Sequence, residues 1–341
     1  MNRSVVFELS GTSPANSLYC SYAVTPTMYS GLVRGAMRAA SEKGQGMAAA
    51  TPDDGPLWLD GRLVAAEIRR QSAEEVQALV AKHHLLPGLA VVRVGEDPAS
   101  VQYAERIVKS FASVGLEATV FALPERVPRS ILHAELDRIN VLPEFAALLV
   151  QWPLPAHLGW DTVIDVIDPN KDVDGSHPIN IGRFTLGMDS YVPATPAGGI
   201  ALLDHYRIPL EGRRALVLGR SGIVGRPLAQ LFLSRNATVT IAHSRSHDIP
   251  ELVREADIVA SATGKPGLIT GDMLKPGAVV VDFGASVIDG RMTGDVDAES
   301  AAKVASAITP VPGGTGPMTN AMLIRNTLKA IRRSLGAMRE T

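Results

Sequence analysis

The stretch VLGRSGIVGRP, residues 217–227, decides the fold. It begins as an apolar strand, passes through a turn with glycines at 219, 222 and 225, and continues as a helix. Because glycine has no Cβ, backbone amides in such a turn can approach a phosphate, and the helix N-terminus favours anionic oxygens. Its position between a strand and a helix predicts a dinucleotide-binding Rossmann domain rather than a plain tight turn.

The next predicted strand, 238–243, indicates which dinucleotide binds. It ends in IAHSRS, without the Asp or Glu that would bind both ribose hydroxyls. Ser244 and Arg245 follow instead, and Arg220 lies in the glycine-rich turn. These side chains suit a 2′-phosphate, so the sequence favours NADP over NAD as the cofactor.

Strands and helices alternate along both halves of the chain. We expect helices over 63–83, 97–115, 129–140, 197–206, 223–235, 251–256 and 320–335, and strands over 87–95, 118–123, 145–155, 213–219, 238–243, 257–263 and 278–284. This alternation is typical of parallel sheets with right-handed crossovers, and therefore of an α/β fold.

Composition narrows the class of protein. The chain has 341 residues, an apolar fraction of 46%, a charged fraction of 20% and a formal net charge of −2. These values fit a soluble two-domain protein and give no reason to expect nucleic acid or a membrane as partner. The single cysteine, Cys20, excludes an intrachain disulfide and fits a cytoplasmic location. Residues 1–55, rich in Ser, Thr, Ala, Gly and Pro, are expected to be a disordered extension.

The sequence KDVDG, residues 171–175, places two acids beside a lysine. Two carboxylates without a histidine or a third acid make a poor metal site, so a solvated turn is the alternative and no metal is expected. The same chain carries four other unusual motifs: VGEDPAS at 94–100, VQWPLP at 150–155, VPATP at 192–196 and PVPGGTGPMT at 310–319.

With these motifs the chain resembles the bifunctional methylenetetrahydrofolate dehydrogenase/methenyltetrahydrofolate cyclohydrolase family, from about Leu57 to the last helix. The resemblance implies two α/β domains with a cleft between them and a C-terminal helix that returns to the first. The folate-binding catalytic domain would be 56–195 plus 317–341, and the Rossmann NADP-binding domain 196–316. The resemblance also implies tetrahydrofolate derivatives as partners, and a homodimer.

Site residues follow from the resemblance, position by position. Tyr103, Gln151 and Asp174 match catalytic residues, with Gln151 the partner of a catalytic lysine and Asp174 the anchor of the pteridine ring. Substrate-binding positions are Tyr103, Asp174, Pro312, Gly313, Gly314, Gly316 and Pro317. Gly219, Arg220, Ser221 and Ser244 match cofactor contacts of the family. The glycine-rich turn adds Gly225, the end of the following strand adds Arg245, and Ala285 lies beside the expected nicotinamide position.

One departure bears on the activity. The family's catalytic lysine stands four residues after the tyrosine, where this chain has Ile107. Arg106 stays protonated and cannot act as a base, and Lys109 lies about 120° around the helix from Tyr103. Hydride transfer from 5,10-methylenetetrahydrofolate releases no proton, whereas hydrolysis of the methenyl product needs an acid–base group. The sequence therefore predicts an NADP-dependent dehydrogenase with weak or absent cyclohydrolase activity.

Other interpretations remain open at this stage. The chain could be a full bifunctional enzyme, a Rossmann dehydrogenase for another small or one-carbon substrate, or a protein that only binds folate or NADP. Two smaller departures are Ala285 beside the expected nicotinamide position, and Trp152, which either packs in the core or crowds the folate ring.

Overall fold

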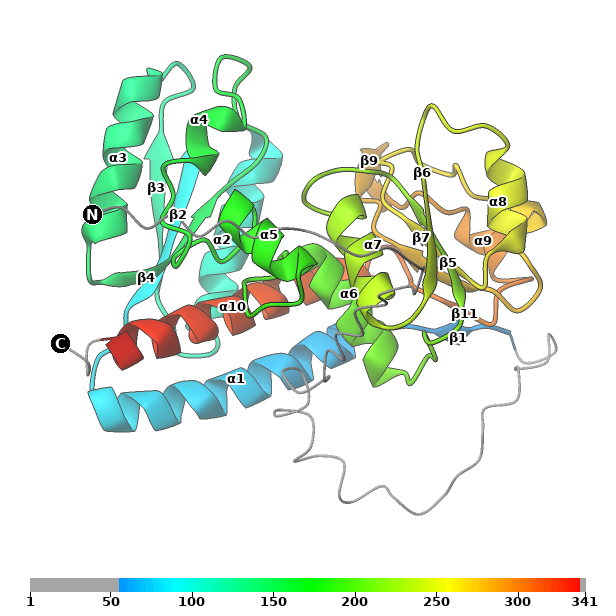
Figure 1. Ribbon diagram of the computed structural model, residues 1–341, viewed down its shortest axis with the longest axis horizontal. Helices are drawn as coiled ribbons and strands as arrows, with labels where there is room; N and C mark the ends of the chain where they lie inside the picture. Colours follow the sequence, from blue (N-terminus) through cyan, green and yellow to red (C-terminus); the bar gives the residue numbers. More distant parts are fainter. Residues whose placement is uncertain (1–54, 338–341) are drawn as a thin grey trace, which may run out of the picture. The chain divides into compact units, whose positions relative to one another are not determined.

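The computed structural model describes residues 55–337 of the chain. The expected extension, 1–55, lies outside the described residues except for Gly55. Within the described part the chain forms two parallel sheets and the helices that cover them (Figure 1). The fold is therefore α/β, as the alternation of strands and helices predicts.

The first sheet has the order β3-β2-β4, and all its strands are parallel. Its elements are β2 (Gly88–Val94), α2 (Pro98–Ala112), β3 (Ala118–Leu123), α3 (Arg129–Val141), β4 (Phe145–Val150), α4 (Asp161–Ile164) and α5 (Pro178–Thr185). Every residue of β2 and β4 is buried, as their continuous apolar sequences require. Alternate residues of these strands belong to two separate apolar clusters, one with α2 and one with α3, so the two helices cover opposite faces (Figure 1).

The second sheet has six parallel strands in the order β1-β11-β8-β7-β5-β6. Its strands are β1 (Leu57–Trp58), β5 (Arg214–Leu218), β6 (Thr238–Ala242), β7 (Ile258–Ser261), β8 (Val279–Asp282) and β11 (Ala307–Ile308). The connecting elements are α7 (Gly225–Ser234), α8 (Ile249–Glu255), the 3₁₀ turn η3 (Gly271–Met273), the hairpin β9 (Ser286–Ile288) and β10 (Arg291–Thr293), and α9 (Ala298–Ala301). This is the Rossmann arrangement that the glycine-rich turn predicts.

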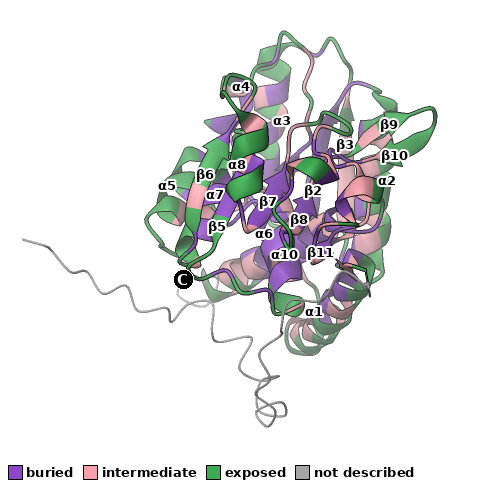
Figure 2. Cartoon of the chain, turned by 90° about the vertical axis from the view of Figure 1, so that its right-hand side faces the viewer, coloured by how far each residue is buried: buried purple, intermediate pink, exposed green. Residues whose placement is uncertain are grey.

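Three helices join the two sheets. Helices α1 (Gly61–His83) and α10 (Thr315–Ala337) pack side by side, and α10 also packs against α6 (Ala194–His205) and β4 (Figure 1). One apolar cluster includes residues of both sheets and of these helices, and Figure 2 shows buried residues along the strands and α10. The C-terminal helix thus returns to the first domain, as expected.

The structure places two segments differently from the expectations. Leu57 and Trp58, assigned from the sequence to the first domain, pair with β11 in the second sheet. The last helix begins at Thr315 instead of 320, because the Thr315 hydroxyl donates to the carbonyl of Asp282 at 2.8 Å and Pro317 is tolerated in a first helical turn. Gly316 and Pro317 therefore belong to the helix.

Candidate functional site

Helix α2 carries the tyrosine assigned to the folate side. The Asp97 carboxylate caps this helix, accepting hydrogen bonds from the Ser100 backbone at 2.8 Å and the Ser100 hydroxyl at 2.9 Å, and Pro98 occupies the first turn. Tyr103 lies one turn further and packs against the apolar core while remaining partly exposed. The guanidinium carbon of Arg106 lies 5.9 Å from its ring centroid.

The Tyr103 hydroxyl stays neutral at ordinary pH. Burial raises its pKa, the charge of Asp174 raises the pKa further, and Arg106 opposes the shift. Since the charge of Asp174 acts on Tyr103, the structure brings together two residues that the sequence assigns to one site. A neutral phenol can exchange hydrogen bonds with a substrate, but it cannot serve as a general base.

The two acids of the turn 171–175 have different roles. Asp172 is buried, and its carboxylate accepts hydrogen bonds from the Ser176 hydroxyl at 3.1 Å, the His177 backbone at 2.8 Å and the Asn180 amide at 2.8 Å. These contacts hold the turn in shape. With its donors all from the protein, Asp172 is a structural residue.

Asp174 is the acid left for a ligand. Burial raises its pKa to about 7, the charge of Asp172 raises it as well, and no hydrogen bond from residues 55–337 lowers it. The turn is held in place from behind by Asn326 of α10, whose amide donates to the carbonyls of Val173 at 2.7 Å and Val192 at 2.9 Å. The turn that carries Asp174 is thus fixed, while its carboxyl group has no hydrogen-bond donor among the described residues.

Gln151 directly follows β4, and its backbone N–H donates to the Val92 carbonyl at 2.9 Å. Its side chain is only 4% exposed, and within the described part of the chain neither its Oε1 nor its Nε2 has a hydrogen-bond partner. Ile107 is fully buried in the apolar cluster that also contains Phe111. Helix α2 therefore offers a hydrocarbon at the lysine position, while the amide expected to bind that lysine lacks a partner.

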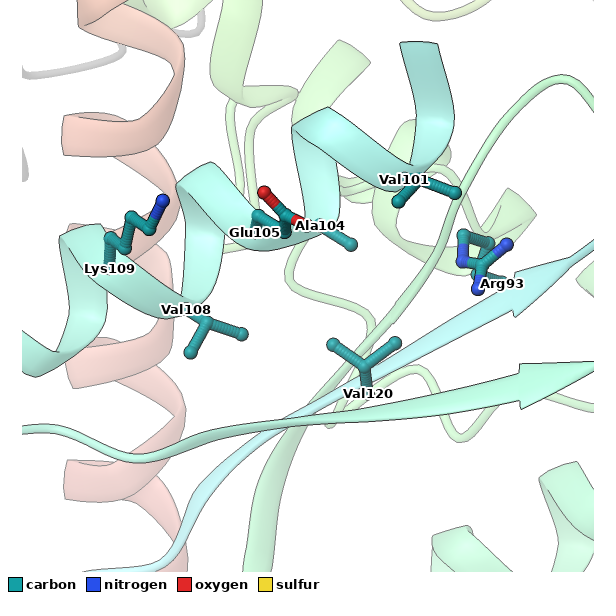
Figure 3. A pocket seen from close by; sticks show the side chains of 7 residues that line it. All are labelled: Arg93, Val101, Ala104, Glu105, Val108, Lys109 and Val120. Atoms are coloured by element: carbon teal, nitrogen blue, oxygen red, sulfur yellow. The ribbon is translucent and has the colours of Figure 1, made fainter. Parts of the chain in front are cut away.

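The lysine two residues further on does not replace it. Lys109 lines a surface pocket together with Glu105 and Val108 of α2, and with Arg93 and Val120 of the sheet (Figure 3). Tyr103 does not belong to this lining. Lys109 thus lies on a different face of α2, as the helical spacing predicts.

Trp152 packs against another indole. Its ring stacks on that of Trp160, with centroids 4.5 Å apart and an angle of 29° between the planes. The sequence leaves two roles for Trp152, packing within the protein or crowding the folate ring. The contact with Trp160 supports packing.

The proline- and glycine-rich segment before α10 is tied to the start of α1. The Arg62 guanidinium donates to the Pro312 carbonyl at 3.2 Å, and the Gly61 N–H donates to the Gly313 carbonyl at 2.9 Å. Gly313 has φ of +119°, a conformation that glycine adopts without strain. Gly314 is buried and donates its N–H to the Pro310 carbonyl at 2.8 Å. These hydrogen bonds fix the conformation of the loop before α10.

The glycine-rich turn connects β5 to α7. Gly219 has φ of +115°, and a Cβ there would collide with the Ala262 carbonyl, while a Cβ at Gly225 would collide with the carbonyl of Gly219. The Ser221 hydroxyl accepts a hydrogen bond from the Gly225 N–H at 3.2 Å, and Gly222 faces open space. The tight backbone and the open side fit a phosphate group at the start of a helix.

The other cofactor positions lie at the same edge of the sheet. β5 and β6 are parallel neighbours, so Arg220 after β5 and Ser244 and Arg245 after β6 all follow carboxyl ends of strands, and all three are exposed. Ala285 follows β8 and is exposed as well. Ligands of open α/β sheets bind at this edge.

Sequence analysis did not predict two residues that support the site through hydrogen bonds. Asn326 holds the turn of Asp174, and Asp295 holds the loop after β7 through its buried carboxylate. The signals available in the sequence were one of the two asparagines of the last helix and the first of the two acids in GDVD, 294–297. Neither signal says what the side chain touches.

The described residues contain no group of three or more side chains that could hold a metal ion. Among them, no helix combines the length and apolar character that a membrane span requires.

Two family profiles match the chain. Residues 59–174 match the tetrahydrofolate dehydrogenase/cyclohydrolase catalytic domain, and residues 193–335 match the NAD(P)-binding domain of the same family. A protein from Herpetosiphon aurantiacus named bifunctional protein FolD is 50% identical over 275 residues, covering 80% of this chain and 96% of that protein. Another of the same name, from Rhodospirillum rubrum, is 48% identical over 83% of this chain and 100% of its own length.

Solved structures give the same result. The bifunctional FolD enzyme from Campylobacter jejuni is 40% identical with a TM-score of 0.79, covering 81% of this chain and 98% of that one. The Trypanosoma brucei dehydrogenase-cyclohydrolase, solved with NADP cofactor and an inhibitor, is 37% identical with a TM-score of 0.79, covering 82% and 99%.

Proposed function

This chain belongs to the tetrahydrofolate dehydrogenase/cyclohydrolase family, and we propose that it oxidises 5,10-methylenetetrahydrofolate to 5,10-methenyltetrahydrofolate with NADP while having weak or no cyclohydrolase activity. Two observations together support the proposed weakness of the cyclohydrolase activity: the burial of Ile107 and the unsatisfied amide of Gln151. The isoleucine fills the lysine position with hydrocarbon, and the glutamine amide is buried without a partner among the described residues.

Asp174 binds and orients the folate in this proposal. A carboxylate can accept hydrogen bonds from a ring N–H and an exocyclic amino group at once, which fixes the pteridine in one orientation. Among residues 55–337 no donor contacts its carboxyl group, so ligand donors can bind it directly. Their hydrogen bonds would favour the ionised form of a group whose pKa burial raises to about 7. Tyr103 faces the same ligand as a neutral hydroxyl, and Pro312, Gly313, Gly314, Gly316 and Pro317 supply the loop and helix start that cover it.

The second domain holds the cofactor. When bound, NADP supplies the acceptor for the hydride of the bridging carbon. The turn with Gly219, Ser221 and Gly225 offers backbone amides to its phosphates. Arg220, Ser244 and Arg245 are exposed at the same sheet edge and suit the 2′-phosphate, which is the reason for proposing NADP. Ala285 follows β8 on the nicotinamide side of the proposed site.

The two half-reactions make different demands on the side chains. Loss of a hydride from the methylene carbon leaves a cation stabilised by two nitrogens, so positioning of the substrate suffices. Hydrolysis requires attack by water, removal of its proton and protonation of a departing nitrogen. Neither Ile107 nor the neutral Tyr103 can exchange a proton in that way, and Lys109 lies on a different face of α2.

The alternative is a full bifunctional enzyme, which the names of the relatives with 50% and 48% identity favour. One assay separates the two: purified protein receives 5,10-methylenetetrahydrofolate and NADP, and NADPH and methenyltetrahydrofolate are followed independently. Matched accumulation of both supports a dehydrogenase without hydrolase. Clearance of the methenyl compound faster than in buffer supports the bifunctional enzyme. Absence of NADPH would favour another one-carbon substrate or a binding protein.

We also propose that the enzyme works in the cytoplasm as a homodimer. The family resemblance supports the dimer, and the single cysteine at position 20 is compatible with a reducing compartment. Sedimentation analysis of the purified chain tests the dimer, since a monomer at micromolar concentration would contradict it.

A further inference from the structure

We propose that Asp295 is a positioning residue for the cofactor: its buried carboxylate fixes the loop 262–265 in the shape that receives NADP. The inference rests on the proposed NADP-dependent function. It concerns a residue outside all the positions assigned from the sequence.

The contacts of Asp295 converge on one short segment. The side chain has no exposed surface, and its Oδ2 accepts hydrogen bonds from the Ser261 hydroxyl at 2.9 Å, the Thr263 N–H at 2.6 Å, the Thr263 hydroxyl at 2.9 Å and the Gly264 N–H at 3.3 Å. Three of these four donors belong to the loop that follows β7. A buried carboxylate therefore sets the path of this loop.

That loop forms one side of the dinucleotide crevice. Strand β5 lies between β6 and β7, so the chain leaves β5 toward one neighbour and later returns on its other side. Ligands bind where the strand order reverses in this way. The Ala262 N–H donates to the Leu218 carbonyl at 2.7 Å, and the Ala262 carbonyl lies against Gly219 of the glycine-rich turn. The loop held by Asp295 thus stands directly beside the phosphate-binding turn.

Asp295 is itself held rigidly by a second acid. The carboxylate of Asp282, at the end of β8, accepts hydrogen bonds from the N–H groups of Gly284 at 2.7 Å, Asp295 at 3.0 Å and Val296 at 2.9 Å. The carbonyl of Asp282 accepts the hydroxyl of Thr315 at the start of α10. The loop beside the cofactor turn is therefore fixed to the framework that also carries the folate loop.

When a loop is already ordered before binding, less conformational entropy is lost as the ligand binds, and the affinity is higher. Replacing Asp295 by Asn keeps the size of the side chain but removes the charge that strengthens its four hydrogen bonds. In the Asp295→Asn variant the loop loosens, and NADP must order it on binding. Folate binding, which uses Tyr103, Asp174 and the loop before α10, does not depend on that step.

The test measures binding directly by titration calorimetry on the full-length chain, with NADP and with 5-formyltetrahydrofolate as separate ligands. We expect Asp295→Asn to raise the Kd for NADP about tenfold and the Kd for the folate by less than about twofold. The matched control is Asp257→Asn. Asp257 likewise accepts a backbone N–H, that of Arg214 at 2.9 Å, but it precedes β7, at the end of the strand opposite to the loop 262–265. This variant should leave both Kd values unchanged.

A folded Asp295→Asn protein that binds NADP as tightly as wild type overturns the proposal, as does an equal loss for both ligands. If this variant does not fold, Thr263→Val and Ser261→Ala decide. Thr263→Val removes a hydrogen-bond donor in the loop and should raise the Kd for NADP about threefold. Ser261→Ala removes a donor within β7 and should leave this Kd unchanged. Equal effects of the two variants refute the inference. Failure of the wild type to bind NADP refutes the proposed function instead.

Discussion

Replacing Ile107 by lysine should raise the hydrolytic activity that we propose is weak or absent in this chain. Ile107 has no exposed surface, so the new amine would be desolvated, and burial lowers the pKa of a lysine toward the range of an acid–base catalyst. The unpartnered Oε1 of Gln151 is the acceptor expected to orient it. An acid–base group contributes about 10²- to 10⁴-fold, so methenyltetrahydrofolate should be hydrolysed at least about 100-fold faster than by the parent protein.

The control for this variant is Ile107→Met, which has a similar unbranched stem and no amine. Both substitutions disturb a packed site, and the lysine should cost about 2 kcal/mol of stability or more because it buries a polar group. The assay follows the decay of methenyltetrahydrofolate against buffer, with NADPH formation as the check of an intact site. If the lysine variant keeps dehydrogenase activity yet hydrolyses no faster than the methionine variant, the amine does not determine the hydrolytic activity of this site.

Three further predictions concern single residues. Burial raises the pKa of Asp174 to about 7, and donors of the ligand favour its ionised form. The KM for the folate should therefore fall as the pH rises through about 7. The Asp174→Asn variant should show no such pH dependence when KM is measured across the same range. Arg245→Ala should lower the preference for NADP over NAD by about tenfold in comparative kcat/KM, and an unchanged preference would assign the 2′-phosphate to other groups. Gln151→Leu should raise the Tm, because it removes a buried amide that has no partner within the described part of the chain, while weakening folate binding. A lower Tm would show that the amide is satisfied in solution.

The sequence predicts those parts of the fold that depend on neighbouring residues. The strand predicted over 118–123 coincides with Ala118–Leu123, because a short β-branched and aromatic run bounded by other elements has few alternatives. Strand β1 shows the opposite case: two residues pair with Ala307 and Ile308, about 250 positions away, and no local pattern reveals that partner. The early start of α10 likewise depends on a hydrogen bond from Thr315 to Asp282 across the fold.

The same distinction applies to the site. The family resemblance already singles out Asp174 over Asp172, but it gives no physical reason, and the position of the hydrogen-bond donors supplies one. Asp172 receives three from residues 176–180, whereas Asp174 receives none within the described part of the chain. Asp295 could not be assigned from sequence, because its role comes from contacts about 30 residues earlier in the chain.

Among residues 55–337 the side-chain amide of Gln151 has no hydrogen-bond partner, and this bears on the interpretation of the isoleucine at position 107. A buried amide that makes no hydrogen bond costs about 1–3 kcal/mol, so a site with no further use for it would be more stable with a hydrocarbon side chain there. Ile107, at the position where the lysine is expected, is such a hydrocarbon side chain and is fully buried in the apolar cluster. Because Gln151 is still polar, a ligand has to supply its partner if the cost is to be offset. A folate, with its ring nitrogens and carbonyl, is such a ligand, and its binding is a step that the proposed hydride transfer requires.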